Sequence, residues 1–271
     1  MKIILLCDAN QNQVALANKI ADRFQLSGIV IETPASRNKN TPDLSQLFEK
    51  FLNKTIFIAQ RRAWFGMLGY YKKTYPAFPK TETIFVNNIN EDVTIAFINQ
   101  IKPDLLLVSG TSLVKKKLLS LPIPFGIINL HTGLSPYIKG APNCTNWCIA
   151  GNKLHLIGNT VMWIDAGIDS GDLLYTALTP LTGQESLLEL HIKVMEHAHK
   201  MYLDAVQKIR DDFSNCSRVK QSSIAAGTVY FNKQWNWKAK LSLIKNFKKL
   251  PAYFTSEQYQ ADKAAVVTVD L

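Results

Sequence analysis

Several features that define membrane proteins and metalloproteins are missing from this 271-residue sequence. No apolar run reaches the roughly 18 residues of a membrane span. The apolar start is too short for a secretory signal and is followed at once by polar residues. The four cysteines show no metal-ligand spacing, and Cys144 and Cys148, one helical turn apart, indicate packed thiols and not a disulfide. We therefore expect a cytoplasmic protein without a bound metal.

Acidic residues are absent from one long segment. Residues 213–256 contain no Asp or Glu, and their eight Lys and Arg residues account for most of the formal net charge of +10. Such a segment could contact phosphates, a nucleic acid or an anionic membrane, but a solvated basic surface explains it equally well. Within it, residues 235–240 mix aromatic rings with cations, which suits stacking on a base and also suits docking of a tail helix.

The loop after the first apolar run, residues 8–13, lacks the Gly-x-Gly-x-x-Gly motif, which argues against a nicotinamide cofactor. This loop leads into an expected helix. The free N–H groups of a helix N-terminus favour anions, so the loop could contact a phosphate or a substrate. A simple polar cap is an equally good explanation, and both interpretations stay open.

The rest of the composition, 47% hydrophobic and 19% charged, is ordinary for a globular protein. Apolar runs typical of strands alternate with helix-like runs up to about residue 210. This alternation predicts an α/β fold with a Rossmann-like, mostly parallel sheet and helices on both faces. The expected strands are residues 2–7, 28–32, 83–86 and 104–109, and the expected helices are residues 13–24, 41–53 and 92–100.

After residue 131 the pattern changes. A long irregular loop is expected first, and a long amphipathic helix closes the region. The expected elements are a loop over residues 132–142, a helix over 143–150, strands over 154–164 and 172–178, and the long helix over 186–210. Residues 211–271 are then a short basic C-terminal extension with one expected strand, residues 227–231. Residues 61–75 are basic and aromatic and do not indicate their structure.

Asn129 and His131 follow an apolar run that we expect to be a buried strand. Ligands of open α/β sheets bind at the carboxyl ends of such strands. Asp169 lies in a later loop bounded by glycines. An amide can hold a carbonyl oxygen, an imidazole can carry a proton, and a carboxylate can fix the imidazole's tautomer and charge. The three residues therefore predict a site where an amine attacks an acyl-level carbonyl, rather than polar groups that merely satisfy a loop.

The other histidines give weaker signals. His191, His197 and His199 fall on the long expected helix, where His197 and His199 cannot share one face. Packing and surface positions account for them without a metal site.

Four motifs together resemble the folate-dependent formyltransferases. They are Asn129-x-His131, the Gly-Leu-Ser-Pro-x-x-x-Gly loop that starts at Gly133, Gly158-Asn-Thr-Val161, and Gly167-Ile-Asp169-Ser-Gly171-Asp172. The resemblance is strongest over residues 103–174 and extends over residues 1–210, which it identifies as the catalytic domain. One departure is Gly133-Leu-Ser-Pro136, where many members of the family have Ser-Leu-Leu-Pro.

The resemblance implies a reaction in which N10-formyltetrahydrofolate donates a formyl group to a primary amine. Asn129 would hold the formyl oxygen, His131 would act as a general base or proton carrier, and Asp169 would orient His131. It also implies two sets of contacts. These are pterin contacts from Val108, Ser109, Gly110, Asp165 and Gly167, and substrate contacts from Asn10 and Asn12.

The length of the C-terminal extension indicates which kind of amine accepts the formyl group. Methionyl-tRNA formyltransferases carry a larger, barrel-like C-terminal domain, whereas glycinamide ribonucleotide enzymes end near the long helix. The intermediate length favours a nucleotide-linked amino sugar, as in O-antigen biosynthesis. Initiator tRNA is the alternative because the extension is basic, and a formate-releasing hydrolase or a non-catalytic nucleotide-binding protein are others. A candidate homodimer contact is the apolar set Trp235, Trp237, Leu241, Ile244 and Phe247.

Overall fold

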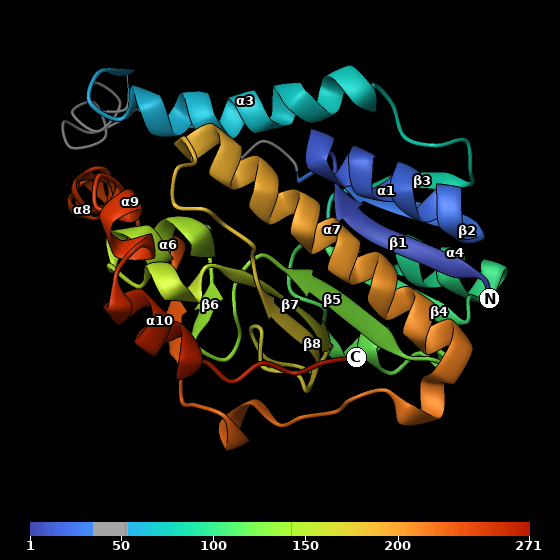
Figure 1. The fold of residues 1–271 in the computed structure, drawn as a ribbon. Coiled ribbons are helices and arrows are strands. Elements are labelled where there is room, and N and C mark those ends of the chain that lie inside the picture. Colours follow the sequence, from blue (N-terminus) through green and yellow to red (C-terminus); the bar gives the residue numbers. More distant parts are fainter. Residues whose placement is uncertain (35–51, 53, 142) are drawn as a thin grey trace.

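The computed structural model describes residues 1–34, 52, 54–141 and 143–271. Its centre is a seven-stranded sheet with the strand order β3-β2-β1-β4-β5-β7-β8 and helices on both faces (Figure 1). The strands are β1 (Ile3–Asp8), β2 (Leu26–Glu32), β3 (Thr83–Val86), β4 (Leu105–Ser109), β5 (Ile127–His131), β7 (Gly158–Trp163) and β8 (Leu173–Leu178). The first five run parallel, and β7 is antiparallel to both β5 and β8. The predicted mostly parallel α/β sheet is therefore confirmed.

Alternate residues of β1 face the two helical layers on opposite sides of the sheet. Ile3 and Leu5 are fully buried on the face covered by α1 (Gln11–Arg23) and α7 (Leu187–Asp212). Ile4 and Leu6 are fully buried on the opposite face, in a cluster with residues of α4 (Asp92–Ile101) and α5 (Lys116–Leu119). A strand that is covered on both faces must be apolar at every position, which is why β1 is a continuous hydrophobic run.

The helix α3 (Ile58–Thr74) forms a further layer on α1 and α7 (Figure 1). Met67 and Tyr71 are buried in that contact. This helix occupies most of residues 61–75, for which the sequence indicated no structure. The helix expected over residues 41–53 lies largely outside the described residues. None of the described helices combines the length and apolar composition of a membrane span.

Two expected elements need correction. The loop expected over residues 132–142 contains a short strand, β6 (Ile138–Gly140), which pairs in parallel with β9 (Thr228–Tyr230). The strand expected over residues 154–164 begins with a 3₁₀ turn, Leu154–Leu156, before β7. The first error has a physical cause, because the partner of β6 lies far along the chain and local patterns do not report it.

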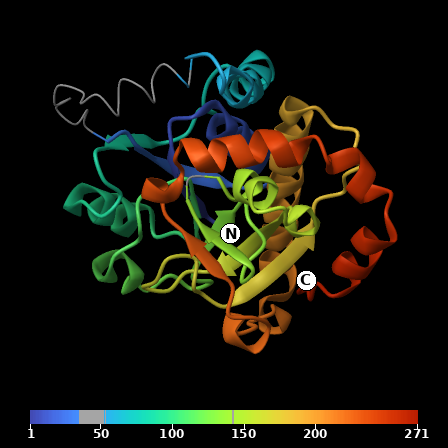
Figure 2. The same ribbon diagram turned by 90° about the vertical axis from the view of Figure 1, so that its left-hand side faces the viewer.

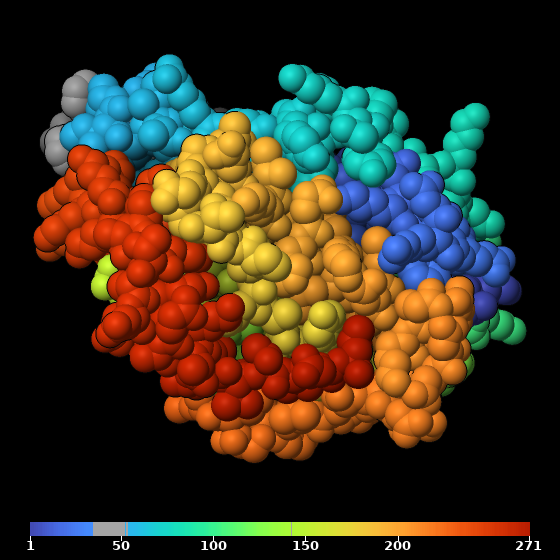
Figure 3. All heavy atoms as spheres, viewed as in Figure 1, coloured from blue at the N-terminus to red at the C-terminus, as the bar shows by residue number. Residues whose placement is uncertain are grey.

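The C-terminal residues pack onto the body of the molecule. The helices α8 (Trp237–Phe247), α9 (Leu250–Phe254) and α10 (Glu257–Ala264) lie on the side of α6 (Cys144–Ala150), and α8 crosses α6 (Figure 2). Leu243 and Leu250 are buried there in one cluster with residues of α6 and α7. Figure 3 shows the orange and red C-terminal residues forming one surface with the body.

The side chains expected to make a dimer contact do not all face outward. Trp235 packs edge-on against Trp147, with 4.7 Å between the ring centroids, and Phe247 packs against the cluster of α6. Trp237 and Leu241 are 42% and 40% exposed. A homodimer contact through these two exposed residues stays a prediction.

Candidate active site

A cavity of about 700 Å³ opens at the carboxyl ends of β1, β4 and β5. Its volume lies within the range of roughly 300–1,000 Å³ that is usual for small-molecule sites. The sheet order reverses between β1 and β4, and ligands of open α/β sheets bind at such a point. The cavity brings together every residue that the sequence predicted for the site: Asn10, Asn12, Val108, Ser109, Gly110, Asn129, His131, Asp165, Gly167 and Asp169.

The strand β5 directs Asn129 and His131 to this cavity. Because successive residues of a strand face opposite sides, Asn129 and His131 share one side and Leu130, 6% exposed, enters the core. Tyr202 of α7 secures the ends of β4 and β5. Its buried hydroxyl accepts a hydrogen bond from Val108 N at 2.9 Å and lies 2.9 Å from Ile128 O. Sequence reasoning missed Tyr202, which looks like one more apolar residue of the long helix.

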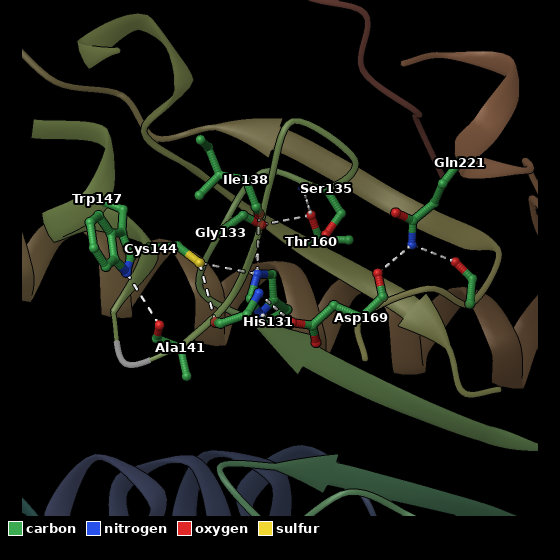
Figure 4. Close-up of polar contacts among 12 residues, drawn as sticks. His131, Gly133, Ser135, Ile138, Ala141, Cys144, Trp147, Thr160, Asp169 and Gln221 are labelled. Carbon is green, nitrogen blue, oxygen red and sulfur yellow. Dashed lines mark hydrogen bonds and ion pairs between the residues drawn. The ribbon is translucent and has the colours of Figure 1, made fainter. Parts of the chain in front are cut away.

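His131 is held at both ring nitrogens (Figure 4). Nδ1 lies 3.4 Å from Oδ2 of Asp169, which also accepts a hydrogen bond from Gly140 N at 2.9 Å. Nε2 lies 3.4 Å from Ile138 O and 3.5 Å from Sγ of Cys144. Burial by itself lowers the imidazole pKa, but the Asp169 carboxylate, together with Cys144 and the Ile138 carbonyl, raises it to about 10. These contacts favour the protonated, cationic form of the imidazole.

The amide of Asn129 is available to a ligand. It lines the cavity, and its side chain makes no hydrogen bond with any residue that the structure describes. A carboxamide nitrogen carries two N–H donors. The site thus presents a free donor group next to a buried cation, an arrangement that can stabilise an oxygen as it gains negative charge.

Gly133 and Cys144 pack against the imidazole of His131. A Cβ atom at position 133 would lie 2.7 Å from Cβ and 2.8 Å from Sγ of Cys144, and still closer to Nε2 of His131. Only glycine leaves room for this pair, which accounts for the glycine where Ser-Leu-Leu-Pro has its serine. Cys144 and Cys148 are both free and buried, as predicted, and burial raises the pKa of each thiol.

The first loop holds its asparagines in different ways. Asn10 donates to the carboxylate of Asp8 through its backbone N at 2.8 Å and through Nδ2 at 2.6 Å. Asn12 is 6% exposed, and its Oδ1 has no partner among the described residues. Burial raises the pKa of Asp8, although its hydrogen bonds from Asn10 oppose that shift. No lysine or arginine is among the described residues that line the cavity.

The loop that carries Asp169 is shaped by internal hydrogen bonds. Oδ1 of Asp165 accepts from Gly167 N at 2.9 Å and from the Ser170 hydroxyl at 2.6 Å. Gly110, at the end of β4, has a φ of +71°, in the left-handed region that favours glycine. Because Gly110 and Gly167 have no side chain, only backbone faces the cavity at these two positions.

Several residues of the cavity wall were not predicted. Trp64 comes from α3, and Tyr230, Phe231 and Asn232 come from the C-terminal extension. Tyr230 stacks on Trp147 of α6, with ring centroids 4.3 Å apart. No local pattern marks these residues, because tertiary packing alone brings them to the cavity. No cluster of three or more His, Cys, Asp or Glu that could hold a metal occurs within the described ranges.

Comparison with curated proteins places the chain in a family. Residues 53–206 match the family described as "Formyl transferase". The methionyl-tRNA formyltransferase of Clostridium tetani is 28% identical over 220 residues, which cover 77% of this chain and 68% of that protein. The enzyme of the same name from Clostridium perfringens strain 13 is 34% identical over 122 residues, 44% of this chain and 38% of that protein.

Solved structures share the fold. A 4-N formyltransferase from Francisella tularensis has a TM-score of 0.57 at 16% identity, with 90% of this chain and 87% of that chain covered. A phosphoribosylglycinamide formyltransferase from Anaplasma phagocytophilum has a TM-score of 0.53 at 16% identity, with 78% and 88% covered. Because the family match spans more than half of the sequence, the chain belongs to the formyl transferase family of folate-dependent enzymes.

Proposed function

We propose that this protein transfers a formyl group from N10-formyltetrahydrofolate to the primary amine of a nucleotide-linked amino sugar, in a pathway of the O-antigen type. The observation that carries the proposal is the meeting of Asn129, His131 and Asp169 in one cavity, with the Asn129 amide free and the imidazole charged. Membership of the formyl transferase family supports the donor.

The donor fits the part of the cavity between the end of β4 and the loop that carries Asp169. Residues 108–110 line it at the end of β4, and Asp165 and Gly167 line it from the Asp169 loop. Backbone N–H and C=O groups can bind the polar edge of a pterin ring, while the absence of side chains at Gly110 and Gly167 leaves space for the ring. When bound, the donor supplies an electrophilic formyl carbon and a nitrogen leaving group.

Asn129 and His131 act on the formyl oxygen in this proposal. As the amine attacks, that oxygen gains negative charge, and the Asn129 amide donates a hydrogen bond to it. The His131 imidazolium adds a positive charge beside the same atom. Because Asp169 favours the protonated imidazole, His131 gives its proton to the departing nitrogen of the donor and takes up the proton that the attacking amine loses, so it carries one proton between the two nitrogens and is not the initial base.

The part of the cavity wall around Asn10 and Asn12 suits a sugar better than a phosphate. Among the described residues that line the cavity there is no lysine or arginine, the Asp8 carboxylate is one of them, and the buried Oδ1 of Asn12 has no hydrogen-bond partner in that part of the chain. Sugar hydroxyls can donate to this oxygen, so we assign Asn10 and Asn12 to the sugar ring. The Francisella 4-N formyltransferase matches 90% of this chain, whereas the Anaplasma enzyme matches 78%. The C-terminal extension, which contributes Tyr230 and Asn232 to the cavity, is thus compatible with a sugar-type enzyme.

Methionyl-tRNA is the second candidate acceptor. The curated relatives from both Clostridium species are methionyl-tRNA formyltransferases. The C-terminal extension also exposes a set of lysines on and around α8: Lys233, Lys238, Lys245, Lys248 and Lys249. If these lysines bind phosphates, affinity for tRNA falls steeply with salt.

One assay distinguishes the candidates. The purified chain is incubated with N10-formyltetrahydrofolate and either a panel of nucleotide-linked amino sugars or methionyl initiator tRNA, and release of tetrahydrofolate is followed by absorbance. Formylation of an amino sugar supports the proposal. Formylation of tRNA alone refutes the acceptor, formate release without any acceptor indicates a hydrolase, and no turnover of the donor refutes the activity.

The same assay tests the catalytic residues. Asn129→Ala removes the free donor and is expected to lower kcat by roughly 10²–10³-fold. Asn236→Ala is the matched control, because Asn236 caps α8 away from the cavity. Full activity of Asn129→Ala would show that the oxygen is stabilised elsewhere.

A further inference from the structure

A glutamine of the C-terminal extension is bonded to the loop that carries Asp169. Gln221 lies in a 3₁₀ turn, Gln221–Ser223, and is 7% exposed. Its Nε2 donates to Asp169 O and to Gly171 O, each at 2.8 Å (Figure 4). One amide group therefore holds the carbonyl groups of Asp169 and Gly171, the two residues that flank Ser170 in this loop.

Asp169 needs such an anchor because its backbone is unusual. It has a φ of +47°, in the left-handed region that residues with a Cβ adopt reluctantly. Asp165, Ile168 and Ser170 of the same loop are exposed, so packing does little to hold it. Gln221 bonds the carbonyl of Asp169 itself, which restrains the peptide whose rotation would turn the carboxylate away from His131.

Backbone pairing fixes the position of Gln221. Val219 and Leu173 exchange two hydrogen bonds across an antiparallel bridge, Leu173 N to Val219 O at 2.8 Å and Val219 N to Leu173 O at 3.1 Å. This bridge lies two residues before Gln221 and one residue after Asp172. The glutamine is thereby placed directly against the loop, and its side chain has little freedom to swing away.

The extension also holds the other partner of the Asp169 carboxylate. The strand β9 pairs with β6, and Ala141 N donates to Tyr230 O at 3.0 Å. Gly140, in the same pair of strands, donates its N–H to Oδ2 of Asp169. The carboxylate that faces His131 is therefore held at its own backbone by Gln221 and at its oxygen by a strand that β9 supports.

We infer that Gln221 is a positioning residue for formyl transfer, which sets the Asp169 carboxylate against the His131 imidazole. The C-terminal extension is then part of the active site and not only a covering of α6. This inference rests on the proposed function for its catalytic consequence, but its structural consequence concerns His131 alone and can be measured without donor or acceptor.

The test uses Gln221→Met, which keeps the length of the side chain and removes both donors. Titration of the His131 imidazole in the free enzyme by NMR is expected to show a lowered pKa, because the carboxylate is no longer held at Nδ1. The rate kcat is expected to fall by roughly 10–100-fold with its pH profile displaced in the same direction, since small misplacements of catalytic groups have effects of this size. Gln258→Met is the control, because the exposed Gln258 donates to Asp262 and does not line the cavity.

Gln221→Asn serves as a second variant if Gln221→Met does not fold. The shorter amide can keep one of the two bonds, so an intermediate His131 pKa is expected. A folded variant of either kind with an unchanged His131 pKa and unchanged kcat overturns the inference. If the His131 pKa moves as expected while the wild-type chain formylates no amine, the positioning role stands and the proposed function fails.

Discussion

Replacing Gly133 with serine, the residue that many members of the family carry there, should damage this enzyme. The new Cβ would lie 2.7 Å from Cβ and 2.8 Å from Sγ of Cys144, and closer to Nε2 of His131, whereas ordinary contacts begin at 3.4 Å. His131 cannot simply yield, because Ile138 O and Asp169 Oδ2 hold it on other sides. A serine would therefore push the imidazole by roughly 1 Å out of these contacts, a displacement that can cost about 10²-fold in rate.

The stability of the fold should fall as well. Overpacking of a filled interior costs about 1–3 kcal/mol in the free energy of unfolding. Urea denaturation measures this loss, and kcat with the formyl donor measures the catalytic effect. Gly69→Ser is the matched control, because a Cβ at Gly69 in α3 meets nothing within 4 Å.

A double variant tests the cause. Cys144→Ala removes the sulfur that crowds position 133, so Gly133→Ser with Cys144→Ala should recover part of the lost rate and stability. Residues in contact usually show a coupling of about 0.5–3 kcal/mol in such a cycle. The reasoning is refuted if Gly133→Ser alone keeps wild-type kcat and stability, or if the losses in the double variant are simply additive.

Three further predictions concern titration and hydrogen bonding. The pKa of His131 is raised to about 10 in the fold, so its contact with the Asp169 carboxylate stabilises the fold fully below the unfolded-state pKa and loses this effect as pH rises toward 10. Urea unfolding of Asp169→Asn should therefore show a flatter pH dependence between pH 7 and 10 than wild type. Parallel curves would contradict the assignment. Burial lowers the pKa of His191 to about 4, so the unfolded chain binds the proton more readily and the stability of the fold decreases as pH drops from neutrality toward 4. His191→Phe should reduce this acid sensitivity in thermal unfolding. An equally steep loss of stability in the variant would count against the prediction. Tyr202→Phe removes the buried hydroxyl to which Val108 N donates and which lies 2.9 Å from Ile128 O, and it should cost about 0.5–1.5 kcal/mol in urea denaturation. A loss indistinguishable from zero would mean that water or another group replaces the hydroxyl.

The sequence was a good guide wherever a local pattern carries the information. The run from Ile3 to Cys7 is apolar at every position because helices cover both faces of β1, and a continuous apolar run of that length is recognisable by itself. Asn129, His131 and Asp169 were recognisable for a similar reason. They sit at fixed spacings within glycine-bounded motifs. Asn129 and His131 end β5 at the edge where the parallel strands β1 and β4 also end, whereas Asp169 reaches His131 from the loop after the antiparallel β7.

Other parts of the site could not be read locally. Gln221 stands in a polar stretch where a glutamine looks like any surface residue, and its importance comes from two carbonyl groups near residue 170. The strand β6 has three residues and takes its partner from β9. The left-handed backbone of Asp169 likewise gives no sign in its side chain.

By itself, the sequence determined the α/β class, the edge of the sheet where the site lies and the three catalytic candidates. Those properties follow from hydrophobic periodicity and from residue types at short spacings. The tertiary structure alone decided that the Asp169 carboxylate faces the imidazole, that Gly133 must lack a side chain and that the C-terminal extension is hydrogen-bonded to the loop of Asp169. Each of these depends on distances between atoms that are far apart along the chain, and only the packed fold sets such distances.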